Sequence, residues 1–318
     1  MPLAPIRMHP AYRFGDATPW GGETLRALFG RDIPDERTGE SLEVSVIENL
    51  NSRDDRGTAL SDIIDRYGAR LTGEGFSHPF PLLLKLISAR QQLSVQVHPG
   101  DDYARSHENK LGKSEAWVIL AAEENARLVN GIKQNVTKEQ LLIASQKGGE
   151  VEKLLSSVPV KPGDVFYIPA GTVHAIGGGI TLYEIQQSSD VTYRFYDWER
   201  VDDKGQKREL HLEKALDVTN VVARMDTITP CPLKLSGKGK RELLLSCPYF
   251  GIEQYGACVG AELSPMQSFA IATAIKPATL SWETGELKLN AGDTALLPAD
   301  GYSLTLTGDH LLLSYPRA

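Results

Sequence analysis

The sequence predicts a mainly β protein built from two barrel-like units, with a few N-terminal helices and one short helical insertion. Short apolar segments separated by Gly, Pro and Asn recur at regular intervals, a rhythm typical of β-sandwiches and β-barrels. A string that begins Gly163-Asp164 and continues through an apolar stretch to Pro-Ala is repeated from Gly292 onward. This repeat indicates two copies of one β-barrel half-motif. The second copy carries Ser303 where the first carries His174, so a metal ligand at that position would have been lost from the second unit.

We expect the division between the two units to fall after residue 228. Residues 1–228 would form the unit with the candidate site, and residues 229–318 a degenerate C-terminal unit. Segments 23–29 and 59–67 predict short N-terminal helices. The segment 137–155 is rich in Leu, Glu, Lys, Gln and Ala, with two glycines in its middle, and predicts two short helices inserted into the β-rich chain.

The strands of the first unit carry the polar residues of interest. The segment 82–87 is apolar except for Lys85, and the segment 93–98 alternates strictly between apolar and polar residues, as a strand buried on one face does. Further strands are expected at 41–47, 115–120, 126–130, 166–169, 174–176 and 180–186. Beyond residue 230 the same short-strand rhythm continues to the end of the chain.

Composition excludes several classes of function. The 318 residues carry a net charge of −7, and their Lys and Arg residues form no basic cluster, so we expect no nucleic-acid partner. No uncharged apolar run approaches the ~20 residues that a membrane span requires, so we expect no membrane partner. Three cysteines without a C-x-x-C pair argue against a disulfide framework or a cysteine zinc site. Since the N-terminus also lacks an apolar signal-peptide core, we expect a cytoplasmic protein.

Four residues of the first unit form a possible metal-ligand set: Gln96, His98, Glu115 and His174. Gln96 and His98 are two positions apart on one strand, so their side chains project from the same face. Taken singly, His98 and Glu115 are each more often structural residues than ligands, whereas His174 ends a more specific string that begins at Gly163. Two imidazoles, one carboxylate and one amide oxygen together form a borderline-soft set that suits zinc. With one anionic ligand, a bound dication would keep about one positive charge and act as an electrophile.

Four strings carry a resemblance to a known family: Ser-Val-Gln-Val-His-Pro at 94–99, Gly-Lys-Ser-Glu-Ala-Trp at 112–117, Pro-Ala-Gly-Thr-Val-His-Ala at 169–175 and Gln-Gln-Ser-Ser-Asp-Val-Thr-Tyr-Arg at 186–194. They resemble type I mannose-6-phosphate isomerases in their short bacterial form. The resemblance implies a cupin barrel followed by a second, degenerate cupin. It also implies one zinc ion per chain, held by the four residues above.

The resemblance further implies an isomerase that interconverts D-mannose 6-phosphate and D-fructose 6-phosphate through an enediolate. Arg194 would then be the second cation beside the reacting carbons, and Glu184 would move the proton, with Lys113 or a zinc-bound water as alternatives. Lys85, Ser94, Lys113 and Arg194 would bind the sugar phosphate. We expect a monomer or a weak homodimer, and no partner beyond this small-molecule substrate.

Other cupin functions remain open at this point, because the fold hosts many activities. An iron dioxygenase would usually present a His-x-His pair, and the Gln96-x-His98 pair argues against one. A sugar-phosphate-binding cupin without catalysis is disfavoured because the ligand set, Glu184 and Arg194 are all intact. An isomerase acting on a different sugar phosphate is a further alternative. The family often has Trp at the position of Leu42, a departure that bears on one wall of the pocket and not on the metal.

Overall fold

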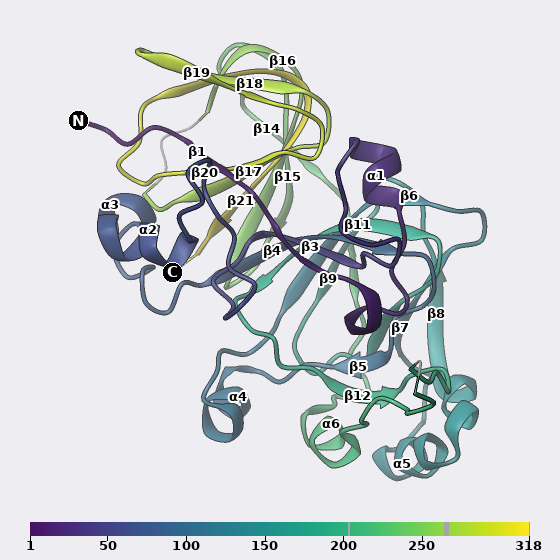
Figure 1. Ribbon diagram of the computed structural model, residues 1–318. Helices are drawn as coiled ribbons and strands as arrows, with labels where there is room; N and C mark the ends of the chain where they lie inside the picture. Colours follow the sequence, from purple (N-terminus) through teal and green to yellow (C-terminus); the bar gives the residue numbers. More distant parts are fainter. Residues whose placement is uncertain (203, 264–266, 318) are drawn as a thin grey trace.

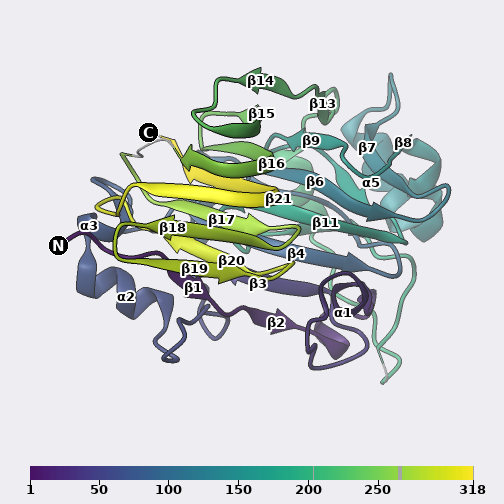
Figure 2. The same cartoon turned by 90° about the horizontal axis from the view of Figure 1, so that it is seen from above.

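The computed structural model describes residues 1–202, 204–263 and 267–317. Three β-sheets stack in layers in this part of the chain (Figure 1 and Figure 2). The seven-stranded middle sheet has the order β13 (Asp226–Ile228), β9 (Val165–Ile168), β6 (Glu115–Ala122), β11 (Ile180–Gln187), β4 (Leu82–Ala89), β3 (Glu40–Val44) and β2 (Ala11–Arg13). The five-stranded sheet has the order β12 (Tyr193–Tyr196), β5 (Val95–Val97), β10 (His174–Ile176), β7 (Arg127–Ile132) and β8 (Leu155–Pro159).

The third sheet has nine strands and comes almost wholly from the C-terminal part of the chain. Its main path is β1 (Ile6–Met8), β20 (Thr294–Leu297), β17 (Ala270–Ala274), β21 (Leu304–Pro316), β16 (Phe250–Leu263), β15 (Lys238–Ser246) and β14 (Cys231–Leu233). Strands β18 (Ala278–Trp282) and β19 (Gly285–Leu289) extend from β21. The prediction of a mainly β fold is confirmed, with antiparallel sheets packed face to face. Among the described residues no sheet closes on itself into a continuous barrel.

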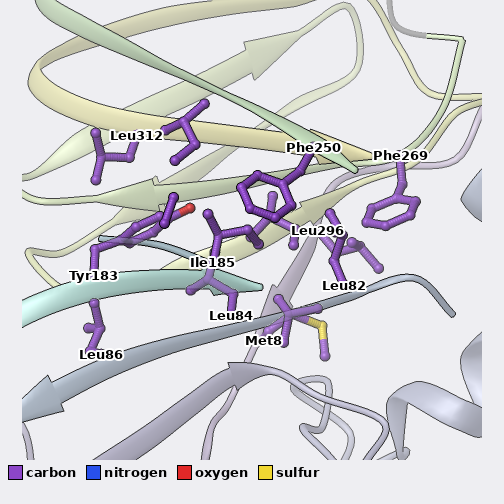
Figure 3. Packing of buried hydrophobic residues seen from close by; sticks show 14 of the residues in the cluster. Met8, Leu82, Leu84, Leu86, Tyr183, Ile185, Phe250, Phe269, Leu296 and Leu312 are labelled. Atoms are coloured by element: carbon purple, nitrogen blue, oxygen red, sulfur yellow. The ribbon is translucent and has the colours of Figure 1, made fainter. Parts of the chain in front are cut away.

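The middle sheet is covered on both faces, and its side chains alternate between the two neighbouring layers. On β11, Tyr183 and Ile185 point toward the nine-stranded sheet, where they join Phe250 and Leu312 in a buried apolar cluster (Figure 3). The intervening residue Glu184 points the other way, toward the five-stranded sheet, and is also buried. The apolar packing on one face therefore fixes which residues of the sheet face the site on the other.

The internal repeat corresponds to equivalent local structures. Gly163 and Gly292 both adopt a positive φ, 90° and 86°, in the tight turns that precede β9 and β20. Both strands then lead into a turn followed by another strand. His174 begins β10, whereas its counterpart Ser303 directly precedes β21.

Helices occupy the predicted places, and the structure adds several others. The N-terminal helices are η1 (Gly15–Ala17), α1 (Thr24–Phe29), α2 (Leu60–Tyr67) and α3 (Ala69–Thr72). The predicted insertion contains α5 (Lys138–Gln146) and the 3-10 helix η2 (Gly148–Leu154), and α6 (Leu212–Val218) follows β12. Helix α4 (Asp101–Glu108) was not predicted, because its polar sequence buries only Ala104 and so shows no apolar helical face.

The chain leaves the middle sheet at Ile228, the end of β13, and enters the nine-stranded sheet at Cys231, the start of β14. The boundary after residue 228 stays a prediction, which this change of sheet supports. Strand β1 crosses that division, because it pairs with β20. None of the described helices has the length and apolar character needed to cross a membrane. The expected cytoplasmic location and monomeric or weakly dimeric state also stay predictions.

Candidate metal centre and adjoining cavity

The candidate ligands meet between the middle and five-stranded sheets. His98 follows β5 and His174 begins β10, so both come from the five-stranded sheet, while Glu115 begins β6 of the middle sheet. One donor atom from each of these three residues lies within 4.8 Å of the others, and all three side chains are buried. Gln96 lies opposite His174 in the β10–β5 register. The sheets thus bring together residues separated by up to 78 positions.

Backbone contacts fix the orientation of both imidazoles. His98 Nδ1 lies 2.9 Å from the carbonyl oxygen of Val191, and His174 Nδ1 lies 2.9 Å from that of Thr172. A carbonyl accepts only, so each Nδ1 carries a proton, and each ring in its neutral form presents a lone pair at Nε2. Both Nε2 atoms face Glu115, at 3.5 Å for His98 and 3.2 Å for His174.

Two hydrogen-bond acceptors therefore face one another in this cluster. The Oε1 atom of Glu115 is buried without a hydrogen-bond partner, and the atom nearest to it from His174 is the lone-pair nitrogen. Such an arrangement is unfavourable unless a cation lies between the acceptors. A backbone carbonyl behind each imidazole and a buried carboxylate are typical of metal centres. The residues present thus fit a divalent metal ion.

Lys113 supplies one positive charge to the cluster. Its Nζ lies 2.8 Å from His98 Nε2 and forms an ion pair with Glu115. Burial raises the pKa of the Glu115 carboxyl, but the neighbouring charge of Lys113 and the hydrogen-bonding surroundings outweigh it, so the pKa lies well below its usual range. Burial is the main cause that lowers the pKa of His98, and the charge of Lys113 lowers it further, so this pKa lies well below its usual value. The carboxylate is ionised and His98 is neutral, as metal ligation requires.

Gln96 lies at the edge of the cluster. Its side-chain nitrogen is 3.4 Å from His174 Nε2, while its Oε1 accepts a hydrogen bond from Ser94 at 3.2 Å. The amide is therefore next to the other candidate ligands, and its oxygen is turned toward Ser94. The prediction that Gln96 is a ligand stays a prediction.

A second polar cluster lies beside the first and centres on Lys85 and Glu184. The Nζ of Lys85 lies 3.2 Å from Glu184 Oε1 and 3.1 Å from Glu40 Oε1. The indole of Trp117 donates to Glu184 Oε2 at 2.8 Å, and Arg13 donates to Glu40 at 3.1 Å. Cross-strand pairing explains the contacts, because Glu184 lies opposite Lys85 on β4 and opposite Trp117 on β6.

Burial disfavours both charges of the Lys85–Glu40 pair, but their mutual attraction outweighs it. For Lys85, burial lowers the pKa, and the charges of Glu40 and Glu184 raise it above its usual value. For Glu40, burial raises the pKa, and Lys85 and Arg13 lower it below its usual value. Both residues are therefore ionised at neutral pH.

A cavity of about 100 Å³ opens beside these clusters, lined by residues of both sheets. It brings together all the predicted substrate and catalytic residues. They are Lys85, Ser94, Lys113, Glu184 and Arg194, and Gln96 also lines it. Sequence reasoning missed four further charged residues of this wall: Arg13, Glu40, Asp190 and Arg208. Glu40 lay within a Gly-Glu-Ser string that could have signalled it, whereas Arg13 and Arg208 had no local signal.

Arg194 differs from the other cations of the cavity. Within the described residues its guanidinium forms no ion pair or hydrogen bond with a protein group, and its Nε is buried without a partner. Burial is the main cause that lowers the pKa of Arg194, and the nearby charge of Arg208 lowers it further. Arg208 itself is bound by both oxygens of Asp197, at 2.7 Å each. Arg194 is thus the cation left available for an anionic ligand.

Comparison with known proteins supports this geometry. Residues 13–111 match the family model described as phosphomannose isomerase type I, catalytic domain. Mannose-6-phosphate isomerase from Streptococcus mutans is 39% identical over 298 residues, which cover 91% of this chain and 92% of that protein. This chain belongs to the type I phosphomannose isomerase family.

Two further relatives come from Bacillus subtilis. Mannose-6-phosphate isomerase ManA is 38% identical over 301 residues, covering 93% of this chain and 89% of the relative. The crystal structure of a mannose 6-phosphate isomerase from the same organism superposes with a TM-score of 0.88 at 32% identity, covering 98% of this chain and 99% of that one. The family's cupin-like fold, expected from the sequence motifs, is therefore confirmed.

Proposed function

We propose that this protein is a mannose-6-phosphate isomerase that interconverts D-mannose 6-phosphate and D-fructose 6-phosphate with a bound zinc ion. The observation that carries the metal-dependent part is the pair of Nε2 lone pairs aimed at one buried carboxylate, Glu115. The family relationship supplies the reaction and the substrate. The basic lining of the adjoining cavity fits a phosphorylated sugar, although the chain as a whole is acidic.

His98, Glu115 and His174 would hold the ion, with Gln96 as the fourth ligand. Two imidazoles and two oxygen ligands form a set that zinc favours. When bound, zinc supplies Lewis acidity, which polarises a sugar carbonyl and stabilises negative charge on its oxygen. The backbone carbonyls of Val191 and Thr172 would keep both imidazoles in the ligating orientation.

The residues of the cavity would carry out the proton transfer. Isomerisation moves a proton between C1 and C2 of the sugar through an enediolate, so a base must lie beside these carbons. We assign this role to Glu184, because it is a buried carboxylate of the cavity wall, held by Trp117 and Lys85. Lys113 is the alternative base. Its ion pair with Glu115 favours instead a role in holding the ligand set and the substrate.

Positive and hydroxyl groups would bind the substrate. Arg194 has a guanidinium without a partner in the described part of the chain, so it is suited to the developing charge of the enediolate or to a substrate oxygen. Lys85, Lys113 and Ser94 line the same cavity and would contact the sugar phosphate.

A coupled assay for fructose 6-phosphate formed from mannose 6-phosphate tests this proposal. Activity that disappears on chelation and returns with added zinc, with a matching metal content, would support both the reaction and the metal. Running the reaction in D₂O and measuring deuterium at C2 of recovered mannose 6-phosphate tests the enediolate. A protein that binds zinc but turns over neither substrate would contradict the proposed activity and favour a sugar-phosphate-binding role.

A further inference from the structure

Arg194 lies on an edge strand, and a single histidine occupies the open side of that strand. Strand β12 pairs with β5 alone, so its other edge leaves backbone groups without strand partners. At Arg194 both groups are bound by His211. The backbone N–H of His211 donates to the carbonyl of Arg194 at 2.9 Å, and the N–H of Arg194 donates to His211 Nδ1 at 3.3 Å.

His211 thus replaces a missing strand at one position. A neighbouring strand would offer an N–H and a C=O to the same residue. Here the backbone of His211 supplies the donor, and its imidazole supplies the acceptor. His211 also directly precedes α6, and its carbonyl oxygen accepts a hydrogen bond from the N–H of Ala215, in that helix, at 2.8 Å. Ala215 is buried in the apolar cluster that covers β5 and β12, so the helix anchors His211 firmly.

The contact matters because it adds to the pairing of Arg194 with Gln96 on β5 and fixes the outer edge of the strand at this position. Its guanidinium has no protein partner among the described residues, so the direction of the side chain depends on where the backbone lies. The strand is also irregular at this point, since the register with β5 shifts between Arg194 and Tyr196. A catalytic group displaced by about 1 Å can lose roughly 10²-fold in rate.

We propose that His211 is a positioning residue that sets the backbone at Arg194 and thereby aims its guanidinium into the cavity. The contact requires an unprotonated Nδ1, because the imidazole must accept the N–H of Arg194. His211 is not among the described residues that line the cavity, so the proposed role acts through Arg194. The inference rests on the proposed function, since it concerns how Arg194 serves the isomerase reaction.

Two substitutions of His211 distinguish the effect of its hydrogen-bond acceptor from the effect of the volume of its ring. Asn places its Oδ1 at the same distance along the side chain as Nδ1 of His, so H211N keeps an acceptor for the N–H of Arg194. Leu fills similar space without an acceptor. We expect H211L to lower kcat about ten-fold or more, with a smaller change in KM, and H211N to stay within about three-fold of the wild type. The exposed neighbour Glu213 provides a matched control, and E213Q should behave as the wild type.

A double-mutant cycle shows whether the effect passes through Arg194. We expect H211L to cost little further activity in an R194A background, because the group that it positions is already absent. Metal content and melting temperature of each variant show whether the fold and the metal centre are intact. Full activity of H211L, equal losses in H211N and H211L, or additive losses in the double variant would overturn the positioning role. Absence of isomerase activity in the wild type would instead overturn the proposed function.

Discussion

Lys85 and Glu184 face one another across β4 and β11, with Lys85 Nζ 3.2 Å from Glu184 Oε1. Both side chains are buried, and Lys85 reaches a second carboxylate, Glu40, on its other side. Lys85 therefore links the proposed base to the wall of the cavity. The ion pair with Lys85 and the hydrogen bond from Trp117 hold the carboxylate of Glu184 in a fixed position. Its Oε1 atom contacts Lys85 as an ion pair but accepts no hydrogen bond from the described residues.

The first prediction concerns the base. We expect E184Q to lower kcat by about 10²-fold or more, because an amide cannot accept the proton while it still fills the same space. Metal content should be unchanged. Deuterium exchange at C2 of mannose 6-phosphate measures the step directly, and E124Q at an exposed position serves as the control. Exchange at the wild-type rate in E184Q would move the base to another residue.

The second prediction concerns the metal ligands. H174A and Q96A should lose bound zinc and activity in parallel, because each removes one of the proposed protein ligands. Metal analysis after gel filtration, together with the coupled assay, measures both losses. H107A and Q91A change exposed residues of the same types and should retain zinc and activity. A Q96A variant with full zinc content would show that the fourth ligand is not Gln96.

The third prediction concerns Arg194. We expect R194A to keep its zinc while kcat falls by about 10²-fold to 10³-fold, since a fixed cation beside the developing charge is lost. R194K should recover little, because a lysine ammonium lacks the planar fork of the guanidinium. Steady-state kinetics with metal analysis test this, with R66A on the surface of α2 as control. Turnover near the wild-type value in R194A would exclude this electrophilic role.

The fourth prediction concerns the pH dependence of stability. The pKa of Glu40 is lower in the folded protein than usual, because the attraction of Lys85 and Arg13 outweighs burial. A lowered folded pKa means that the unfolded chain binds the proton first as the pH falls. Glu40 therefore stabilises the fold above the unfolded pKa of about 4.3, and this contribution is lost as the pH falls through the lower folded value.

We accordingly expect E40Q to be less stable than the wild type by about 3 kcal/mol at pH 7. The difference between the two proteins should shrink as the pH falls below about 4.3. Urea unfolding of metal-free protein across this range measures the difference, and E48Q at an exposed site should show none. A gap between wild type and E40Q that is constant with pH would contradict the assigned ion pair.

Sequence alone determined the mainly β fold, the place of the helical insertion and the candidate residues that the structure brings together between two sheets. The alternation of residues 93–98 indicated that Gln96 and His98 share a face, and the repeat after Gly163 and Gly292 anticipated two matching turns. These features are local, because strand periodicity and turn chemistry depend on residues that are neighbours in the sequence. The family resemblance then implied that all four candidate ligands, Gln96, His98, Glu115 and His174, hold one zinc ion.

Tertiary structure alone decided the partners of these residues. Nothing in the sequence near Lys85 indicates that it joins Glu40 and Glu184, because these contacts depend on strands that pair across the sheet. The same holds for the single acceptor that His211 offers to the edge of β12. Side-chain direction follows from local periodicity, but which side chains meet depends on sheet order and register, and these are set by packing of the whole chain.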